Sequence, residues 1–331
     1  MKIAIFSCKP YDKRTLEHFS QTSKELEFSF FESRLSQETM TLASGFDAIC
    51  CFVNDDVNNT VIRYLAKQGI TAIALRCAGF NNVDLSAAKA SDIKVYHVPD
   101  YSPTSVAEHA LALIMTLTRK THIAYQRVKA GNFALEGLLG FNLQSKTVGC
   151  IGTGRIGQAF CRIMKGFGCN VLCYDVSPNE ALIDLGCHYT DLETLYKKSD
   201  IISLHCPLNA STHHLINGKS LKKMKDGVML INTSRGALVN AQEAIDALYS
   251  GKIGYLGMDV YEQENKIFFE DMSTHIIQDS VFQLMLTFPN VVVTGHQGFF
   301  TQEALDHIAI TTIDNLNKHR KGEVCQRLLN P

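Results

Sequence analysis

The sequence predicts an α/β protein built from two doubly wound parallel sheets. Short runs rich in β-branched and aromatic residues alternate with segments of helical pattern along most of the chain, as in a parallel sheet covered by helices. A Pro-containing segment, VPDYSP at 98–103, separates two such series. The length of 331 residues suits about two domains, and 46% hydrophobic with 20% charged residues is a globular composition. A mostly disordered chain is therefore excluded.

The first series contains four expected strands, each of four to six residues: 2–7, 48–52, 72–75 and 94–98. After the Pro-containing segment, residues 105–131 have the pattern of one long helix, which we expect to act as a hinge. Ser105 precedes Glu108 by three residues, the spacing of a capping box, and this predicts that the helix starts there.

The second series begins at Lys146 and contains six expected strands: 147–152, 170–175, 201–206, 227–232, 253–260 and 291–296. The chain then returns to a helical pattern from Thr301 to about Lys321. Because one helix cannot form a domain, we expect it to pack on the first unit. The predicted organisation is a discontinuous unit of 1–100 plus 299–331 and a continuous unit of 101–298.

Charge and cysteine usage limit the partners and the compartment. The formal net charge is −1 without a run of Lys and Arg, which disfavours nucleic acids and membrane surfaces and favours a small-molecule partner. The eleven cysteines include no C-x-x-C pair, so we expect buried thiols in a reducing compartment and no metal site. The N-terminus is too polar for a signal peptide, and no apolar run could span a membrane, so a cytoplasmic protein is expected.

A dinucleotide-binding pattern opens the second series. Gly152, Gly154 and Gly157 have G-x-G-x-x-G spacing between an expected strand and an expected helix. Asp175 follows Gly157 by eighteen residues at the end of the next strand, where a carboxylate accepts the ribose hydroxyls of NAD and repels the extra phosphate of NADP. The two residues after Asp175 supply no Arg, so the predicted cofactor is NAD.

The position of this pattern in mid-chain and several further motifs resemble the D-isomer-specific 2-hydroxyacid dehydrogenase family. The motifs are RCAGFNNVD at 76–84, VAEHALAL at 106–113, SLHCPL at 203–208, NTSRGALV at 232–239, GMDVYEQE at 257–264 and TGHQGF at 294–299. Within the family, the N-terminal segments are most similar to fermentative D-lactate dehydrogenases. The resemblance implies a flavodoxin-like substrate domain and a Rossmann NAD-binding domain. It also implies cofactor contacts from Arg155, Ile156, Cys206, Pro207, Thr212, Thr233, Ser234 and Asp259.

Three residues have the chemistry that reduction of a 2-keto acid requires. Arg235 lies in a turn after a strand and can grip a carboxylate with its planar guanidinium. His296 follows the last apolar strand and is the candidate proton donor, which we prefer to His109 on an apolar helical face and to His205 beside expected cofactor contacts. Glu264 is the carboxylate that the family pattern pairs with His296. Glu262 is a competing choice, because on an extended segment both carboxylates would face the same way.

Substrate contacts are expected from the first unit. Ala78 and Gly79 can offer backbone N–H groups to a carboxylate, and Tyr101 and Phe299 resemble the aromatic residues that close the family's substrate pocket. Two aromatics leave room for little more than a methyl group, which favours pyruvate and D-lactate over larger substrates. Another D-2-hydroxyacid dehydrogenase or an NAD-sensing corepressor-like protein are the alternatives. The resemblance further implies a homo-oligomer, either a dimer or a tetramer.

Overall fold

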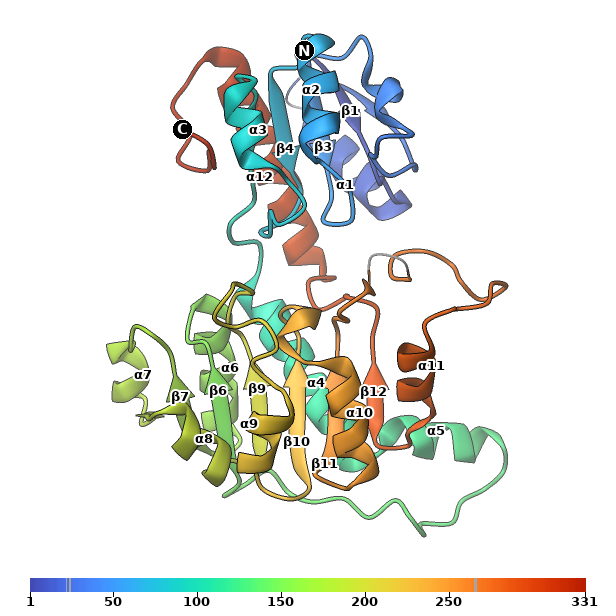
Figure 1. The fold of residues 1–331 in the computed structure, drawn as a ribbon, viewed down its shortest axis with the longest axis vertical. Coiled ribbons are helices and arrows are strands. Elements are labelled where there is room, and N and C mark those ends of the chain that lie inside the picture. The colour runs from blue at the N-terminus through green and yellow to red at the C-terminus, as the bar shows by residue number, and fades with distance from the viewer. Residues whose placement is uncertain (22, 24, 265–266) are drawn as a thin grey trace. The chain divides into compact units, whose positions relative to one another are not determined.

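Both units of the computed structural model, which describes residues 1–21, 23, 25–264 and 267–331, are built around a parallel sheet (Figure 1). One unit comprises Met1–Ser102 with Phe299–Pro331, and the other comprises Pro103–Gly298. The chain thus crosses between them at residues 102/103 and 298/299, where the sequence places the first crossing at 100/101.

The first unit has a five-stranded parallel sheet in the order β2-β1-β3-β4-β5. Its strands are β1 (Lys2–Ile5), β2 (Glu27–Phe30), β3 (Ala48–Cys51), β4 (Ala72–Leu75) and β5 (Lys94–Tyr96). Its helices are α1 (Pro10–Ser20), η1 (Met40–Ala43), α2 (Asn59–Lys67), α3 (Leu85–Ala90) and α12 (Gln302–Lys321). Apolar residues of α2 and α3 pack on one sheet face, and those of α1 and α12 pack on the other.

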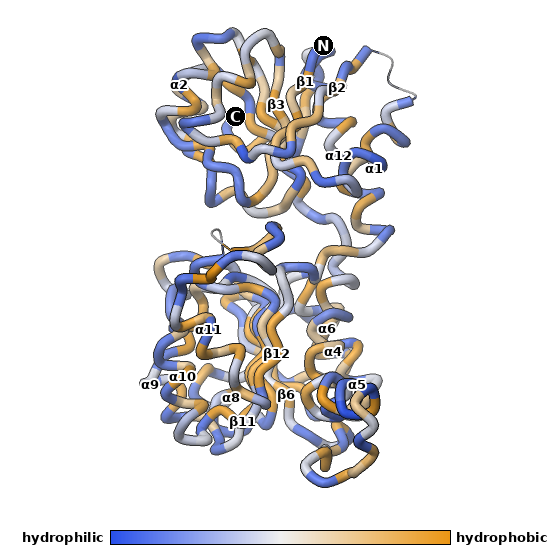
Figure 2. Tube along the Cα trace, turned by 90° about the vertical axis from the view of Figure 1, so that its right-hand side faces the viewer, coloured by the Kyte–Doolittle hydropathy of each residue, from blue (hydrophilic) through white to orange (hydrophobic). Residues whose placement is uncertain are grey.

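The second unit has a seven-stranded parallel sheet in the order β12-β11-β10-β9-β6-β7-β8. The strands are β6 (Thr147–Ile151), β7 (Asn170–Tyr174), β8 (His188–Tyr189), β9 (Ile201–Leu204), β10 (Val228–Asn232), β11 (Ile253–Met258) and β12 (Val291–Val293). The order runs outward in both directions from the neighbours β6 and β9, which is the doubly wound arrangement. Figure 2 shows the hydrophobic character of these strands.

Helices cover both faces of this second sheet. On one face lie α4 (Pro103–Arg119) and α6 (Arg155–Gly166), whose apolar residues pack on Val148, Met229 and Ile231. On the other face lie helices that contact Ile202 and Leu230. These are α8 (Leu192–Lys198), α9 (Gly218–Lys223), α10 (Ala241–Tyr249) and α11 (Ser280–Thr287). The remaining helices are α5 (Thr121–Lys129), α7 (Glu180–Asp184) and η2 (Gly236–Leu238).

Two strands were not anticipated from the sequence. β2 lies at the edge of the first sheet and alternates between exposed and half-buried residues, so its sequence EFSF lacks the apolar run of a central strand. β8 contains only His188 and Tyr189 at the edge of the second sheet. Edge strands bury little apolar surface, and this removes the signal on which strand prediction relies.

The predicted single helix over 105–131 is wrong in two respects. It begins at Pro103, whose fixed φ suits the first helical position, so Ser105 lies inside the first turn and is not the cap. It also breaks at Lys120, which adopts a left-handed conformation with φ +51°. Beyond the break, α5 buries none of its residues, so no apolar face holds the chain in register with α4.

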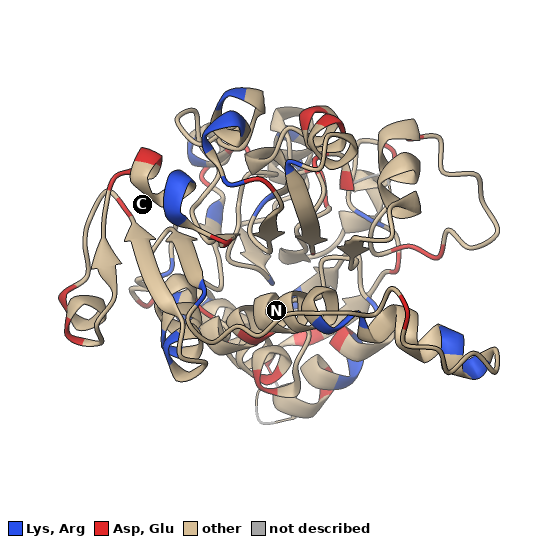
Figure 3. Ribbon diagram, turned by 90° about the horizontal axis from the view of Figure 1, so that it is seen from below, with Lys and Arg blue, Asp and Glu red and all other residues tan. Residues whose placement is uncertain are grey.

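The charged residues, the helices and the cysteines each have the properties of a folded protein with mixed surface charge. Positive and negative residues are interspersed along helices and loops (Figure 3). Among the described residues, every helix is too short or too polar to cross a bilayer. All eleven cysteines are buried and carry free thiols.

Candidate active site

Parallel register brings the predicted catalytic residues to the edge of the second sheet that is formed by the carboxyl ends of its strands. Asn232 of β10 pairs with Met258 of β11, and Met258 pairs with Val293 of β12, so the three strands end side by side. Arg235 and His296 each follow their strand by three residues. Because ligands bind beyond the carboxyl ends of strands in such sheets, this edge is the candidate active site.

His296 and Glu264 form a close pair at this edge. The Nδ1 atom of His296 lies 2.8 Å from Oε1 of Glu264, and both side chains are about 15% exposed (16% and 15%). The other carboxylate oxygen accepts the backbone N–H of Tyr261 at 2.8 Å, which fixes the orientation of the carboxylate. Since Nδ1 is engaged, Nε2 is the nitrogen of His296 that can exchange a proton with a ligand.

The geometry separates Glu264 from its competitor Glu262. The Oε1 atom of Glu262 lies 2.6 Å from Nε2 of His214, so its carboxylate is paired with a different histidine. The two carboxylates therefore do not share one face, because the segment after Tyr261 turns instead of continuing as a strand. The His296 partner is Glu264.

Asp259 organises the turn that carries His296. Its Oδ1 accepts hydrogen bonds from the Thr294 hydroxyl at 2.5 Å and the Gln297 N–H at 2.9 Å, and its Oδ2 accepts from the Gly298 N–H at 2.7 Å. The Nε2 atom of His109, on α4, lies 3.2 Å from Oδ1 of Asp259. Burial alone would raise the pKa of Asp259, but the hydrogen bond and charge of His109, with these other donors, hold it below its ordinary value.

This network explains an unusual backbone conformation. His296 has φ +56°, in the left-handed region that non-glycine residues rarely adopt. The hydrogen bonds from Thr294, Gln297 and Gly298 to one carboxylate close the turn on both sides of His296. We therefore assign His109 and Asp259 a positioning role at this turn. The apolar helical face around His109 predicts a buried structural histidine, and its side chain is 15% exposed.

Arg235 is held by its own turn and by the segment that contains Glu264. The buried Asn232 donates from Nδ2 to the Arg235 carbonyl at 2.9 Å, and the Arg235 Nη1 donates to the Ser234 carbonyl at 2.7 Å. A Cβ on Gly236 would lie 2.0 Å from the backbone carbon of Tyr261. Only glycine permits this approach, so the Arg235 turn packs against the backbone three residues before Glu264.

The three glycines of the dinucleotide pattern have different surroundings. Gly152 has φ +96°, and a Cβ there would lie 2.5 Å from the Cys206 nitrogen, while a Cβ on Gly157 would lie 2.0 Å from the Gly152 oxygen. Both glycines are thus needed by the fold itself. Gly154 precedes α6 with an ordinary φ of −62° and has open space around its Cβ position, which leaves room for a pyrophosphate at the helix N-terminus.

Asp175 is oriented toward the same turn. Its Oδ2 accepts the Thr153 N–H at 2.5 Å and the Thr153 hydroxyl at 3.2 Å, and its Oδ1 accepts the Ser177 N–H at 3.2 Å. The Tyr189 hydroxyl donates to the Thr153 hydroxyl at 2.8 Å. Thr153 and Tyr189 were not singled out from the sequence, because hydroxyl contacts between distant segments leave no local pattern.

The remaining cofactor candidates lie at the ends of β9 and β10 or at the start of α6. The Ser234 hydroxyl donates to the Cys206 carbonyl at 2.7 Å, and the Thr212 hydroxyl donates to the Pro207 carbonyl at 2.6 Å. The Thr233 hydroxyl is buried without a hydrogen-bond partner, a feature that a bound polar ligand would satisfy. Arg155 and Ile156 open the first turn of α6.

His205 is unsuited to proton transfer. Burial lowers its pKa to about 3, so its imidazole stays neutral, and its Nε2 lies 2.9 Å from the Ser203 hydroxyl. Gly152 packs against its backbone. These features favour His296 over His205 as the proton donor.

The predicted substrate contacts belong to the first unit. Phe299 is buried, with ring centroids 6.2 Å from Tyr101 and 6.0 Å from Phe52, so the two predicted aromatics meet and Phe52 joins them. Ala78 and Gly79 follow β4 in the turn of the RCAGF motif, where the carbonyl oxygen of Ala78 lies 3.1 Å from Nδ1 of His97.

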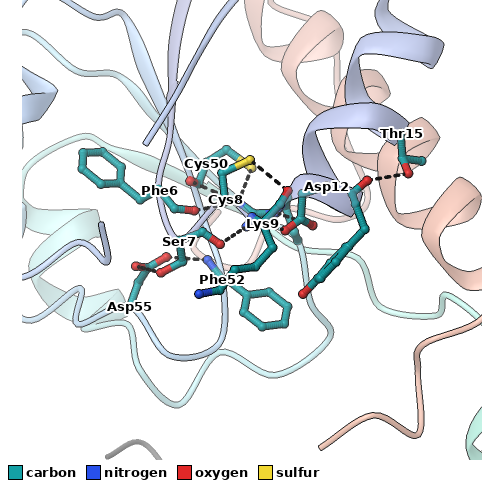
Figure 4. A network of polar contacts seen from close by, with 11 residues as sticks. Phe6, Ser7, Cys8, Lys9, Asp12, Thr15, Cys50, Phe52 and Asp55 are labelled. Carbon is teal, nitrogen blue, oxygen red and sulfur yellow. Dashed lines mark hydrogen bonds and ion pairs between the residues drawn. The ribbon is translucent and has the colours of Figure 1, made fainter. Parts of the chain in front are cut away.

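Buried Arg76 anchors that turn. Its guanidinium donates to the carbonyls of Phe6 at 3.1 Å and Ser7 at 3.2 Å, and its Nε lies 3.4 Å from Asp12 Oδ1. Figure 4 shows the surrounding network, in which Asp55 accepts from the Ser7 hydroxyl. Arg76 thereby ties the ends of β1 and β4 together and fixes the backbone that leads to Ala78.

Comparisons with known proteins match nearly the whole chain to one family of enzymes. The sequence profile of "D-isomer specific 2-hydroxyacid dehydrogenase, NAD binding domain" matches residues 111–298. A D-lactate dehydrogenase of Escherichia coli (strain K12) is 52% identical over 325 residues, covering 98% of each chain. A pyruvate reductase structure from Chlamydomonas reinhardtii has a TM-score of 0.93 at 45% identity and 98% coverage of each chain. A D-lactate dehydrogenase structure from Aquifex aeolicus, complexed with NAD and lactic acid, has a TM-score of 0.89 at 33% identity and 99% coverage of each chain.

Proposed function

Because the chain belongs to the NAD-dependent D-isomer-specific 2-hydroxyacid dehydrogenases, we propose that it reduces pyruvate to D-lactate and so regenerates NAD in fermentation. The observation that carries the proposal is the 2.8 Å pair of His296 and Glu264 at the sheet edge that also bears Arg235. The D-lactate dehydrogenase and pyruvate reductase named among its relatives support the choice of pyruvate.

Arg235 binds the substrate carboxylate in this mechanism. Its guanidinium uses one nitrogen for the Ser234 carbonyl, which leaves further N–H donors for a bidentate contact. A guanidinium in this position also attracts electron density toward the carbonyl oxygen as that oxygen gains charge.

His296 supplies the proton. When bound, NADH would supply the hydride for the carbonyl carbon, and His296 would donate a proton from Nε2 to the carbonyl oxygen of the substrate. Glu264 holds the ring through Nδ1 and faces it with a negative charge. Reoxidation of the product runs the same proton transfer backward, with His296 as the base.

Aromatic side chains near the predicted substrate contacts favour a short substrate. Tyr101, Phe299 and Phe52 pack together in the first unit, and Ala78 and Gly79 present backbone groups at the end of β4. We propose that Tyr101 and Phe299 limit the substrate side chain and that the backbone of Ala78 and Gly79 contacts its carboxylate. On the cofactor side, we propose that Asp175 binds the adenosine ribose, with Gly154 beside the pyrophosphate.

A substrate panel tests the function. We expect the purified protein to oxidise NADH fastest with pyruvate, more slowly with 2-ketobutyrate, 2-ketoisocaproate and phenylpyruvate, and to form D-lactate by chiral analysis. We expect NADPH to be at least about tenfold less efficient, because the Asp175 carboxylate repels a 2′-phosphate. A faster rate with a larger keto acid would refute the aromatic limit. NADH binding without turnover would favour a corepressor-like protein.

The Glu264→Gln variant tests the pairing. Glutamine keeps the length of the side chain but removes the negative charge beside Nδ1 of His296, so we expect kcat/KM for pyruvate reduction to fall by about 10²-fold. The measurement is kcat/KM from initial rates of NADH oxidation. Glu262→Gln is the matched control, since Glu262 pairs with His214 and should leave kcat/KM unchanged. Equal losses in both variants would remove the special role of Glu264.

We also propose that the chain forms a homo-oligomer through α5 and the segment that follows it. This region exposes large apolar side chains in close succession: Tyr125 66%, Val128 52%, Phe133 74%, Leu135 81% and Leu139 87%. Such a concentration is typical of a protein interface. Light scattering should give a dimer or tetramer that Phe133→Ser with Leu139→Ser dissociates, whereas Ile276→Ser, at another exposed apolar site, should not. A wild-type monomer would exclude the proposal.

The state of the thiols supports a proposal for the cellular compartment. All eleven cysteines are free and buried, as in proteins of a reducing compartment. We therefore propose a cytoplasmic location.

A further inference from the structure

Three buried thiols converge in the second unit, outside the candidate active site. Cys161 lies on α6, Cys173 on β7, and Cys187 in the turn before β8. Their sulfur atoms all lie within 4.8 Å of one another, and the Sγ atoms of Cys161 and Cys173 are 3.7 Å apart. The cluster joins three elements that are separated in sequence.

The spacing matches that of thiolates around a metal ion. Ligand sulfurs about 2.3 Å from a tetrahedral zinc lie roughly 3.8 Å from one another. Soft thiolate sets select thiophilic ions such as zinc, whereas calcium and magnesium prefer oxygen ligands. We propose that Cys161, Cys173 and Cys187 form a binding site for one thiophilic divalent cation, with zinc as the physiological candidate.

Cys150 on β6 is a neighbour of the cluster and not a member of it. Its thiol donates to the Gly152 carbonyl at 3.4 Å, and only the sulfurs of Cys161, Cys173 and Cys187 lie within 4.8 Å of one another. The three-thiol set therefore leaves the fourth position of a tetrahedral ion to a small ligand such as water.

The electrostatic surroundings of Cys187 favour metal binding. Lys165 Nζ donates to the Gly186 carbonyl at 3.1 Å, which keeps a positive charge beside Cys187. Three thiolates with one divalent ion carry a net charge of −1, which a nearby ammonium offsets.

An ion would reach the cluster through an opening of the turn before β8. Cys187 lies there, 2% exposed, between half-buried Gly186 and exposed His188. The other two thiols lie deeper, against the apolar core beneath α6. Because the sulfurs already converge, ion binding should link α6, β7 and the β8 turn without moving the glycines that open α6.

Titration of the reduced protein with Cd²⁺ tests this inference, because complexes of Cd²⁺ with thiolates absorb in the ultraviolet. We expect a charge-transfer band that saturates at one Cd²⁺ per chain, release of protons, a mass increase of one ion, and a higher Tm. Zinc should compete for the site, whereas magnesium should not. We expect Cys187→Ser to weaken binding more than about 100-fold, beyond the usual cost of losing a partner that only orients a ligand.

The matched control is Cys325→Ser. Cys325 is also buried, but it lies in the first unit and donates to Asn315 Oδ1 at 3.4 Å, a contact that a serine hydroxyl retains. It should bind cadmium like the wild type. Cys173→Ala provides a second ligand deletion, and NADH binding shows whether each variant is folded. No saturable band, or equal binding by Cys187→Ser and Cys325→Ser, would overturn the proposal whatever the substrate of the enzyme.

Discussion

The His296→Gln variant is expected to reduce pyruvate about 10³-fold more slowly than the wild type at neutral pH. General acid catalysis contributes roughly 10²–10⁴-fold, and glutamine can donate a hydrogen bond but cannot transfer a proton at this pH. The Nδ1 contact with Glu264 shows how the ring is oriented, and it leaves Nε2 for the substrate. The measurement is single-turnover NADH oxidation with saturating pyruvate, which isolates the chemical step from product release.

Two further readouts separate loss of the proton donor from loss of structure. NADH affinity should stay within about threefold of the wild type, because the cofactor candidates lie on other turns. The matched control is His213→Gln, which removes an exposed imidazole. The centroid of this ring lies 3.9 Å from the centroid of the His214 ring. This variant should remain nearly fully active. A His296→Gln rate within tenfold of the wild type would assign proton donation to another group.

The sequence predicts His296 as a candidate site residue but does not predict its backbone conformation. The motif TGHQG places a histidine after the last strand, and strand ends are where ligands bind in parallel sheets. The positive φ of His296, however, depends on hydrogen bonds to Asp259, which lies 37 residues earlier. Such long-range contacts have no local sequence pattern.

The same distinction applies to the fold. The central strands β6, β9 and β10 are buried along their length, so their apolar runs predict them well. The edge strands β2 and β8 and the break at Lys120 were missed, because each bears few buried residues. Sequence patterns therefore predict elements that are buried. They do not predict elements that depend on pairing at a sheet edge or on a single left-handed residue.

The choice between Glu264 and Glu262 shows a further limit. Both carboxylates lie within one short motif, and an extended segment would direct them to the same face. The structure separates them by a turn at Tyr261, whose N–H binds Glu264, and Gly236 packs closely against that residue. A contact between the β10 and β11 turns thus decides which carboxylate faces His296, and a linear motif does not encode it.

The Arg235→Gln variant is expected to lower kcat/KM for pyruvate by about 10³-fold, through both a higher KM and a lower kcat. Truncating one partner of a hydrogen-bonded charge pair costs about 2–5 kcal/mol, and about 4 kcal/mol corresponds to that factor. KM rises because the carboxylate loses its cation, and kcat falls because the alkoxide loses a positive neighbour as it forms.

The Arg235→Lys variant distinguishes charge from geometry. Lysine retains the positive charge but lacks the planar fork that binds both carboxylate oxygens, so we expect it to recover only about tenfold of the lost kcat/KM. Arg162→Lys, on the exposed side of α6, is the matched control and should match the wild type. Full activity of Arg235→Lys would show that charge alone suffices. Both substitutions should preserve the turn, because Asn232 donates to the backbone carbonyl of residue 235 and not to its side chain. Unchanged kinetics of Arg235→Gln would therefore show that other donors bind the substrate carboxylate.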